Sequence, residues 1–271
     1  MPADPAFRAT APSSAVLIAG THSGAGKTTV TLGLLAALVR RGLAVAPFKV
    51  GPDFIDPLHH TRASGRPARN LDGWMLDGAT NRACFARASA DADVAVIEGV
   101  MGLFDGSEGG SDRGSSAEMA KLLGLPVVLV VDAGAMARSA AALIHGFASF
   151  DPELRLAGVV LNRVAGEAHA ATIREAVAGD VPILGAIPYE ASLVVPERHL
   201  GLRLPHETGR EHLDRLAALI ESHLDVDRIL QAGSIARPAP PATIARARSS
   251  VRVGVAEDDA FCFYYAENLE L

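Results

Sequence analysis

The 271-residue chain has few cysteines, few aromatic residues and no long apolar run. Its two cysteines, Cys84 and Cys262, lie far apart and form no CxxC pair, which argues against a disulfide framework and a zinc site and is typical of a reducing, cytoplasmic compartment. No stretch approaches the length of a transmembrane helix, so we expect no membrane association. The 25 basic residues are outnumbered by 31 acidic ones, and the net charge of −6 argues against nucleic-acid binding.

The sequence does contain short apolar runs that alternate with helix-like segments. The apolar runs are typical of strands buried on both faces, and we expect strands at residues 15–20, 43–50, 93–99, 126–133, 156–164 and 181–188. Apolar residues at helical spacing predict helices at residues 27–41, 80–90, 115–124, 136–149, 167–178 and 207–224. This alternation predicts an α/β fold, with a mostly parallel sheet covered by helices on both faces.

Changes of composition predict four regions. Residues 1–14 lack the apolar core of a signal peptide and are interpreted as a flexible leader. Residues 15–230 form the α/β domain. Residues 231–250 are rich in Pro, Ala, Ser and Arg, which is typical of a linker. Residues 251–271 are interpreted as the first strand and turn of a second, truncated domain, because one strand alone is not stable.

The stretch GTHSGAGKTT has the features of a phosphate-binding loop with a displaced glycine. The common pattern, Gly-x4-Gly-Lys-Ser/Thr, would put its first glycine where this chain has Thr21, and Gly20 stands one place earlier. An apolar strand precedes the stretch and a helix follows it, which disfavours an ordinary turn. We expect Lys27 to contact the β- and γ-phosphates and the Thr28 hydroxyl to bind Mg²⁺. The predicted loop residues that bind nucleotide are Thr21, His22, Ser23, Gly24, Ala25, Gly26, Lys27, Thr28 and Thr29.

Longer strings resemble a known family. The loop variant is similar to that of dethiobiotin synthetase, and His22 occupies the position of the signature lysine of ParA/MinD partition ATPases. PFKVGPDFIDPLHH (47–60), NLDGWML (70–76), IEGVMGLFDG (97–106), VVLNRV (159–164), PERHLGL (196–202) and AEDDAFCFYYAENLEL (256–271) resemble the cobyrinic/hydrogenobyrinic acid a,c-diamide synthase family. FKVGPDFID differs from the PQNM-type sequence that follows Phe-Lys in cobyric acid synthase. The resemblance extends from about residue 15 to the end of the chain.

The resemblance implies a dethiobiotin synthetase-like P-loop domain that acts in cobalamin biosynthesis. Such an enzyme uses ATP and Mg²⁺ to amidate the a and c acetate carboxylates of a corrinoid, with nitrogen from glutamine or ammonia. Because a carboxylate resists nucleophiles, phosphoryl transfer would first convert it to an acyl phosphate. The chain has no Gly-x-Cys-x-Gly elbow, so we expect the family's C-terminal glutaminase domain to be a missing partner. We also expect that the chain forms a homodimer.

Charged residues at the predicted strand ends are the candidate catalytic residues. Glu98 ends VAVIE at the edge of the sheet where ligands bind, and we expect it to bind Mg²⁺ or to order the water around it. Lys49 ends the second strand, where its charge would neutralise a transferring phosphoryl group. The resemblance gives Asp53 a metal or catalytic role and Asp105 a role in substrate orientation. An exposed charge or a turn residue is the simpler alternative for each.

The predicted catalytic residues are Lys27, Lys49, Asp53, Glu98 and Asp105, and the predicted metal ligands are Thr28, Asp53 and Glu98. The predicted substrate-binding residues are Phe54, Ile55, Asp56, His59 and Asp72. Turn formation is an equal alternative for Asp56. The pair His59 and His60 lacks a third ligand at a recognisable spacing, so contact with a substrate carboxylate is favoured over metal binding.

Asn162 and three arginines complete the candidates. Asn162 ends VVLN and matches an asparagine that reads adenine in related ligases; its amide offers a donor and an acceptor, although a turn asparagine is the alternative. Arg62, Arg66 and Arg69 are near enough in sequence to the GPDFID loop to meet an acidic substrate.

Two other functions stay open. One is a ParA/MinD-like switch ATPase that dimerises around nucleotide and binds a partner. The other is a ligase for a smaller substrate, although the long loops at 50–80 and 99–115 favour a larger, acidic one. The motifs do not distinguish a cobalt-containing corrinoid from a metal-free one or from a nickel sirohydrochlorin.

Overall fold

The computed structural model describes residues 14–179, 181–190, 209–235, 252–258 and 260–270. The predicted leader up to residue 13, the string PERHLGL and residues 236–250 of the predicted linker lie outside these described residues. The structural statements below concern the described part of the chain.

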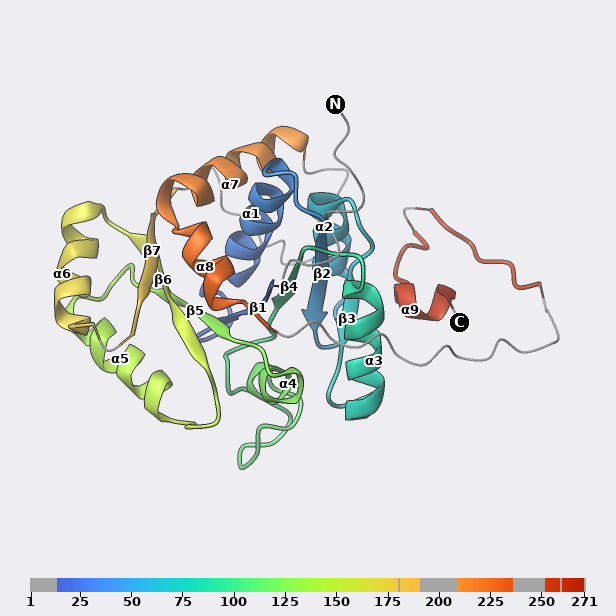
Figure 1. Cartoon of the computed structure of the whole chain (residues 1–271), viewed down its shortest axis with the longest axis horizontal. Helices are drawn as coiled ribbons and strands as arrows, with labels where there is room; N and C mark the ends of the chain where they lie inside the picture. Colours follow the sequence, from blue (N-terminus) through green and yellow to red (C-terminus); the bar gives the residue numbers. More distant parts are fainter. Residues whose placement is uncertain (1–13, 180, 191–208, 236–251, 259, 271) are drawn as a thin grey trace.

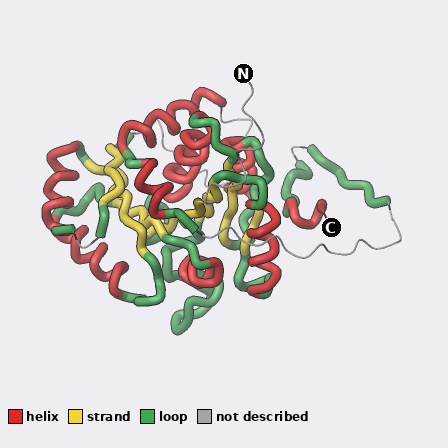
Figure 2. The backbone as a smooth tube through the Cα atoms, viewed as in Figure 1, coloured by secondary structure: helices red, strands yellow, loops and turns green. Residues whose placement is uncertain are grey.

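Seven parallel strands form one sheet, which confirms the predicted parallel sheet and adds one strand to the six expected (Figures 1 and 2). The strands are β1 (Ser14–Gly20), β2 (Val45–Val50), β3 (Arg69–Leu71), β4 (Val94–Glu98), β5 (Val127–Asp132), β6 (Leu156–Val164) and β7 (Ile183–Pro188). Their order is β3-β2-β4-β1-β5-β6-β7. The chain therefore crosses from one half of the sheet to the other after β4, and β1 lies at its centre beside β4 and β5.

Helices cover both faces of the sheet and make a three-layer α/β/α fold (Figure 1). One face packs against α1 (Lys27–Arg40), α2 (Ile55–Ser64), α7 (Arg210–His223) and α8 (Val226–Ala232). The other packs against α3 (Gly78–Ser89), α4 (Ser116–Leu123), α5 (Arg138–Ser149) and α6 (Glu167–Val177). A short last helix, α9 (Ala266–Glu270), follows an extended segment.

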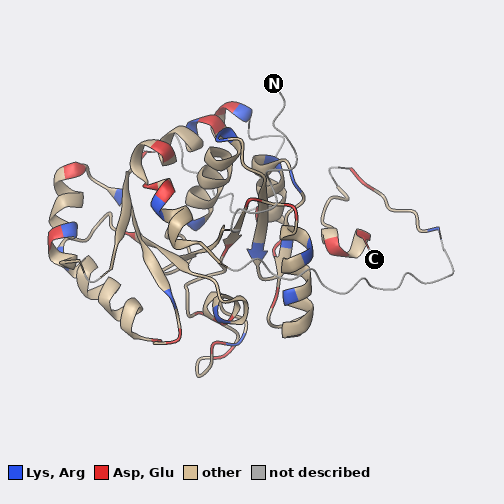
Figure 3. Cartoon of the chain, in the orientation of Figure 1, with Lys and Arg blue, Asp and Glu red and all other residues tan. Residues whose placement is uncertain are grey.

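The apolar runs form strands because both of their faces are buried. Leu17 and Ile18 are neighbours in β1 and both are inaccessible to solvent, yet they belong to different apolar clusters on opposite faces of the sheet. Charged residues concentrate on the helices and loops, and the strands carry few (Figure 3). Among the described residues, no helix combines the length and the apolar character needed to cross a membrane.

Four local elements differ from the sequence-based expectations. The GPDFIDP stretch, predicted as a loop, leads into α2, because Asp53 Oδ1 accepts hydrogen bonds from the backbone N–H groups of Ile55 and Asp56 and starts the helix. The three-residue strand β3 was too short to give a periodic signal. Helix α8 extends to Ala232, two residues into the predicted linker. Residues 252–258 are not a strand, since they hydrogen-bond to no neighbouring strand of the described chain.

Candidate functional site

The carboxyl ends of the parallel strands bring the sequence-predicted residues to one edge of the sheet. Lys49 and Glu98 are register partners on β2 and β4, and Ile18 of β1 is the partner of Glu98 on its other side. Strand β1 therefore ends two residues beyond the level of Glu98, and the loop starts at Thr21. This arrangement places the phosphate-loop candidate and both charged residues together, as parallel strands require.

Glu98 is the centre of a buried polar network. Its side chain is inaccessible to solvent, and three groups contact its carboxylate. Thr28 Oγ1 donates a hydrogen bond to Oε1 at 2.7 Å, and Lys49 Nζ donates to the same oxygen at 2.9 Å. His60 Nε2 lies 2.7 Å from Oε2. Burial opposes ionisation of Glu98, but the charge of Lys49 and the hydrogen bond with His60 outweigh it and hold the Glu98 pKa well below its usual range.

Lys49 joins Glu98 to the start of α2. Its ammonium is hydrogen-bonded to Asp56, lies 3.8 Å from Asp53 Oδ2 and donates to the Gly99 carbonyl oxygen at 3.4 Å. Burial would lower the pKa of Lys49, but the charges of Glu98 and Asp56 raise it above its usual value. Burial and the nearby charge of Glu98 raise the pKa of Asp56 to about 8. The neighbouring acids therefore hold the ammonium in place and favour its charged form.

The residues of the phosphate-loop candidate form a tight turn ahead of α1. Gly26 has a φ of +103°, a conformation that side-chain-bearing residues rarely adopt. Asn162 Nδ2 donates to the Ala25 carbonyl oxygen at 2.9 Å, and a Cβ on Gly26 would lie 2.0 Å from the same nitrogen. Position 26 is therefore restricted to glycine by both backbone conformation and contact. Asn162, predicted to read adenine, is buried against this loop; base recognition by its amide stays a prediction.

Lys27 and the loop tip lie over the same turn. Lys27 Nζ donates to the His22 carbonyl oxygen at 3.2 Å, and burial lowers the pKa of this lysine. Thr21 Oγ1 is 2.9 Å from His22 Nδ1. His22, Ser23 and Gly24 are exposed at the tip of the turn.

The loop after β4 packs onto the phosphate-loop candidate. Leu103 N donates to the Gly20 carbonyl oxygen at 2.8 Å. Asp105 is exposed, and its Oδ2 accepts a hydrogen bond from Gly102 N at 2.9 Å. The charge of Asp105 is also a minor influence on the pKa of Lys27. Asp105 thus shapes the loop beside Lys27, and its role in orienting a substrate stays a prediction.

The other predicted substrate-binding residues are not all gathered at Glu98. Ile55 and His59 lie in α2, where His59 is buried. Phe54 stacks on Tyr265, with ring centroids 4.4 Å apart. Asp72 follows β3 and is buried, and its Oδ1 accepts from Trp74 N and Met75 N, which is the turn-forming alternative for an aspartate. Their contact with a substrate stays a prediction.

Two of the three arginines proposed for an acidic substrate are paired within the chain. Arg66 forms an ion pair with Asp91, and Arg69 forms ion pairs with Glu267 and Glu270. Arg69 is buried, so it does not present a free guanidinium to a ligand in this arrangement. Arg62 is exposed on α2.

Sequence reasoning missed two residues of the site. His60, considered together with His59 for contact with a substrate carboxylate or a metal, is the buried residue that contacts Glu98; a separation of 38 positions gives no local signal for this contact. Ser116 Oγ donates to the Val100 carbonyl oxygen and accepts from Val100 N, which anchors the loop after Glu98. The preceding Ser115, which caps α4, gives the S-x-x-E signal that marks the start of this helix.

The arrangement fits a magnesium nucleotide. In the described part of the chain no cluster of three His, Cys, Asp or Glu side chains is placed to hold a metal ion. A nucleotide-bound Mg²⁺ needs no such cluster, because phosphate oxygens, water and one or two protein oxygens complete its shell. Thr28, hydrogen-bonded to an ionised Glu98 at the N-terminus of α1, supplies such an oxygen, and Lys27 supplies the charge.

Comparison with known proteins gives a consistent set of relatives. Residues 16–202 match the model of the CobQ/CobB/MinD/ParA nucleotide binding domain. The chain is 50% identical over 264 residues to the cobyrinate a,c-diamide synthase of Syntrophotalea carbinolica, with 94% of this chain and 57% of that protein covered. Proteins with the same name from Streptococcus sanguinis and Methanosarcina acetivorans are 46% and 44% identical, each over 94% of this chain and 58% and 56% of their own lengths. The chain thus spans a little over half the length of these relatives.

Solved structures resemble the chain more distantly. Chloroplast FtsY from Physcomitrella patens has 15% identity and a TM-score of 0.47, with 82% of this chain and 66% of that chain covered. FtsY from Elizabethkingia anophelis in complex with GDP has the same identity and TM-score, with 83% and 66% covered.

Proposed function

Since the chain belongs to the CobQ/CobB/MinD/ParA nucleotide-binding domain family, we propose that it carries the ATP-dependent synthetase part of a cobyrinate or hydrogenobyrinate a,c-diamide synthase. The proposed reaction converts the a and c acetate carboxylates of a corrinoid to amides in cobalamin biosynthesis. The observation that supports it best is the buried Thr28–Glu98–Lys49 network, which joins a phosphate loop to a fixed cation beside an acidic loop. The names of the relatives support the choice of substrate.

The chemistry needs a nucleotide because a carboxylate has no good leaving group. A carboxylate oxygen attacks the γ-phosphorus of ATP, the bond from that phosphorus to the bridging oxygen breaks, and ADP leaves. Ammonia then attacks the acyl phosphate carbon, phosphate leaves with the electron pair, and loss of a proton from nitrogen gives the amide. The proposed enzyme is therefore a carbon–nitrogen ligase that consumes one ATP per amide.

Each residue of the network has a role in this proposal. Lys27 and the loop N–H groups hold the β- and γ-phosphates, and Thr28 holds Mg²⁺, which supplies charge neutralisation when bound. Glu98 orients Thr28 and Lys49. Lys49 faces the phosphoryl group and the substrate carboxylate, and because its pKa is raised it keeps the positive charge that such a role requires. Asp56 also holds Lys49, and Asp53 lies within ion-pair distance of it.

The source of nitrogen is a separate part of the proposal. Activation and amidation belong to the residues described above, so free ammonia would be a sufficient donor. Glutamine would serve when a glutaminase domain accompanies the synthetase. We propose this domain as the partner, together with a homodimer of the chain.

Mass spectrometry of the substrate tests the proposal directly. Hydrogenobyrinic and cobyrinic acids are each incubated with the chain, Mg-ATP and ammonium, and the diamide is expected, with ADP formed in equal amount to each amide. Lys49→Met, with nucleotide binding checked by calorimetry, is the matched variant and should bind ATP but form no amide. The better substrate identifies the state of the macrocycle, and sirohydrochlorin with nickel is the third compound to compare.

Failure of amidation has two distinct readings. ATP binding with no amide from any of the three compounds, with ammonium or glutamine, would contradict the proposal. Nucleotide-dependent dimerisation in light scattering, together with that failure, would support the switch ATPase of the ParA/MinD type instead.

A further inference from the structure

The segment of residues 260–270 returns to the sheet at its β3 edge. It lies far in sequence from β2, β3 and α3, yet it contacts residues that follow or belong to each of them. Figure 1 shows α9 beside α3 at this edge, and an ion pair between Arg87 of α3 and Glu267 of α9 joins the two helices. These contacts are of two kinds, aromatic and acidic.

The aromatic contacts converge on Phe54. Its ring stacks on Tyr265 at a centroid distance of 4.4 Å and an interplanar angle of 26°, and on Phe263 at 5.7 Å and 27°. Tyr265 Oη also donates to the Pro52 carbonyl oxygen at 3.4 Å. Burial raises the pKa of Tyr265, and the charges of Asp72 and Asp53 add to the effect. Two rings thus hold a third, that of Phe54, which directly follows Asp53 in the chain.

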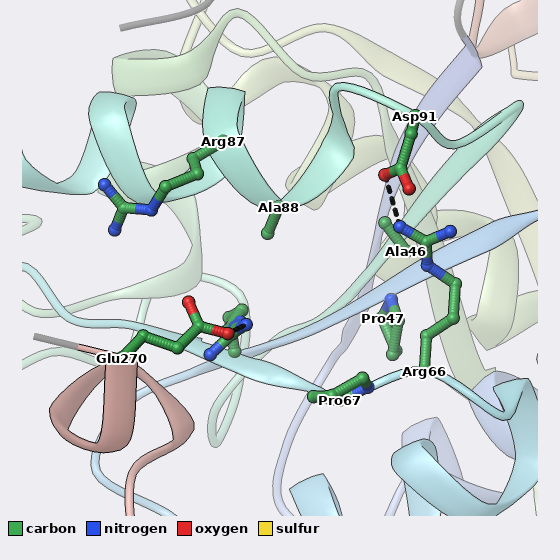
Figure 4. Close-up of a pocket in the computed structure, with 9 residues that line it drawn as sticks. Ala46, Pro47, Arg66, Pro67, Arg87, Ala88, Asp91 and Glu270 are labelled. Carbon is green, nitrogen blue, oxygen red and sulfur yellow. Dashed lines mark hydrogen bonds and ion pairs between the residues drawn. The ribbon is translucent and has the colours of Figure 1, made fainter. Parts of the chain in front are cut away.

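The acidic contacts converge on two arginines. Arg69 is buried and pairs with Glu267 at 3.4 Å and with Glu270, and Glu267 also pairs with Arg87. Figure 4 shows Glu270 of α9 at the wall of a pocket of about 230 Å³ that Arg66 and Arg87 also line. A buried arginine is costly without a carboxylate, so this surface requires an acidic ligand, and α9 supplies it.

Phe54 connects this docked segment to Lys49. It stands between Asp53, whose Oδ1 accepts the N–H groups that start α2, and Asp56, which is bonded to Lys49. On the other side, Asn70 Nδ2 donates to the carbonyl oxygens of Gly51 and Asp53, each at 2.8 Å. The loop 52–56 is therefore fixed from β3 by Asn70 and from outside by the stacked rings.

We propose that the surface formed by Phe54, Arg69 and Arg87 is a docking site for the aromatic and acidic segment 263–270, and that docking holds residues 52–56 in the arrangement that presents Asp56 to Lys49. Phe263 and Tyr265 are positioning residues in this proposal, because they act on Lys49 through the loop. The docking does not depend on the identity of the substrate, so it stands or falls separately from the function proposed above.

Hydrogen exchange of the whole chain tests the docking. In Phe263→Ala/Tyr265→Ala, amides of residues 53–60 should exchange about three to ten times faster than in the wild type, because the stacked rings no longer hold the loop. Exchange in β1 and α1 and the affinity for Mg-ATP should stay unchanged, which separates a local effect from unfolding. Phe261→Ala is the matched control; this ring is 57% exposed and its loss should leave residues 53–60 unchanged.

Two further variants separate the two kinds of contact. Tyr265→Phe keeps the ring and loses only the hydroxyl, and it should exchange like the wild type. Glu267→Gln/Glu270→Gln removes the acidic contacts and should accelerate exchange of the same amides. Unchanged exchange at residues 53–60 in both double variants would overturn the proposal, and so would equal acceleration in Phe261→Ala.

Discussion

Lys49 and Glu98 stand opposite each other on neighbouring strands, and the Lys49 ammonium donates to a Glu98 carboxylate that solvent does not reach. Such a pair is stable because each charge has further partners. Asp56 completes the shell of Lys49, while Thr28 and His60 complete that of Glu98. Removal of either member leaves an uncompensated buried charge.

Replacement of Lys49 by methionine should therefore destabilise the fold by about 3–5 kcal/mol, because Glu98 loses its main counter-charge in a buried site. Urea unfolding measures the loss. Lys121→Met is the matched control: Lys121 pairs with Asp112 and Asp151, but its side chain is 25% exposed. Its replacement should cost only about 0–1 kcal/mol. Equal losses of unfolding free energy in the two variants would contradict a larger contribution of the buried Lys49 network to stability.

Stability should fall as pH rises from about 5 to 8, in a way that depends on Asp56. The folded-state pKa of Asp56 is raised from 3.8 to about 8, so the native state binds a proton that the unfolded state has already released in this range. The free energy of unfolding then decreases with pH. The lowered pKa of Glu98 changes the stability only below about pH 4.5, its usual pKa, and the raised pKa of Lys49 changes it only above about pH 10.5. Neither group therefore contributes to the slope between pH 5 and 8.

Urea unfolding of the wild type and Asp56→Asn at several pH values isolates this effect. The stability difference, wild type minus variant, should decline steadily between pH 5 and 8, since only the wild type carries the titrating group. A difference that is constant or grows over this range would contradict the raised pKa.

A Cβ at position 26 should destabilise the phosphate loop more than one at position 24. Both glycines have positive φ, +103° and +84°, and this conformation costs an alanine roughly 1–2 kcal/mol at either position. Only Gly26 faces a side chain, because its Cβ would overlap the Asn162 amide, whereas the space at Gly24 is open. In thermal unfolding without nucleotide, the melting temperature of Gly26→Ala should be lower than that of Gly24→Ala.

Asn162→Ala in the Gly26→Ala background supplies the control for this contact. It removes the overlap and should recover part of the lost stability, so the two substitutions are expected to be non-additive. Strict additivity would mean that Asn162 does not limit the residue at position 26.

Replacement of Thr28 by valine should weaken the effect of Mg²⁺ on ATP binding, whereas replacement of Thr31, within one turn of α1, should leave ATP binding intact. Thr28→Val removes the donor to Glu98 and the proposed Mg²⁺ ligand, so Mg²⁺ should enhance ATP affinity about 10–100-fold less than in the wild type. Thr31 is fully buried, and its hydroxyl has no hydrogen-bond partner among the described residues. Thr31→Val should be neutral or stabilising by about 1 kcal/mol.

Calorimetric titration of ATP with Mg²⁺ or with EDTA checks the first half of this prediction, and urea unfolding checks the second. Thr31→Val is also the control for nucleotide binding, which it should leave intact. A Thr28→Val protein with the wild-type response to Mg²⁺ would remove Thr28 from the metal site.

The fold was predictable where one local pattern decides the structure. Each of the six expected strands is an apolar run, and the sheet buries all of them between two helical layers. Helix α2 was missed because its residues, IDPLHHTRAS, have no apolar face, so its packing against the rest of the chain cannot be read from periodicity. The strand β3 has three residues, too few to show a periodic pattern in the sequence.

The candidate site was predictable to the same degree. The phosphate loop is a contiguous motif, and Lys49 and Glu98 were found because both end apolar runs. His60 and Tyr265 were not assigned their contacts, since each meets its partner across a long stretch of chain, and only the folded structure brings α2, β4 and the segment before α9 together. Asp53 and Asp72 both show turn geometry, which local propensity anticipated as the alternative for Asp53 but not for Asp72.

The Glu98 carboxylate contacts both halves of the site. Its Oε1 accepts hydrogen bonds from Thr28 of the phosphate loop and from Lys49 of β2, and its Oε2 contacts His60. A change at either side of Glu98 alters the hydrogen bonds available to the other. We therefore expect the two halves of the sheet edge to be thermodynamically linked: a ligand that strengthens the Thr28 side would change the affinity of the Lys49 side, and by reciprocity the second ligand would change the affinity for the first by the same factor.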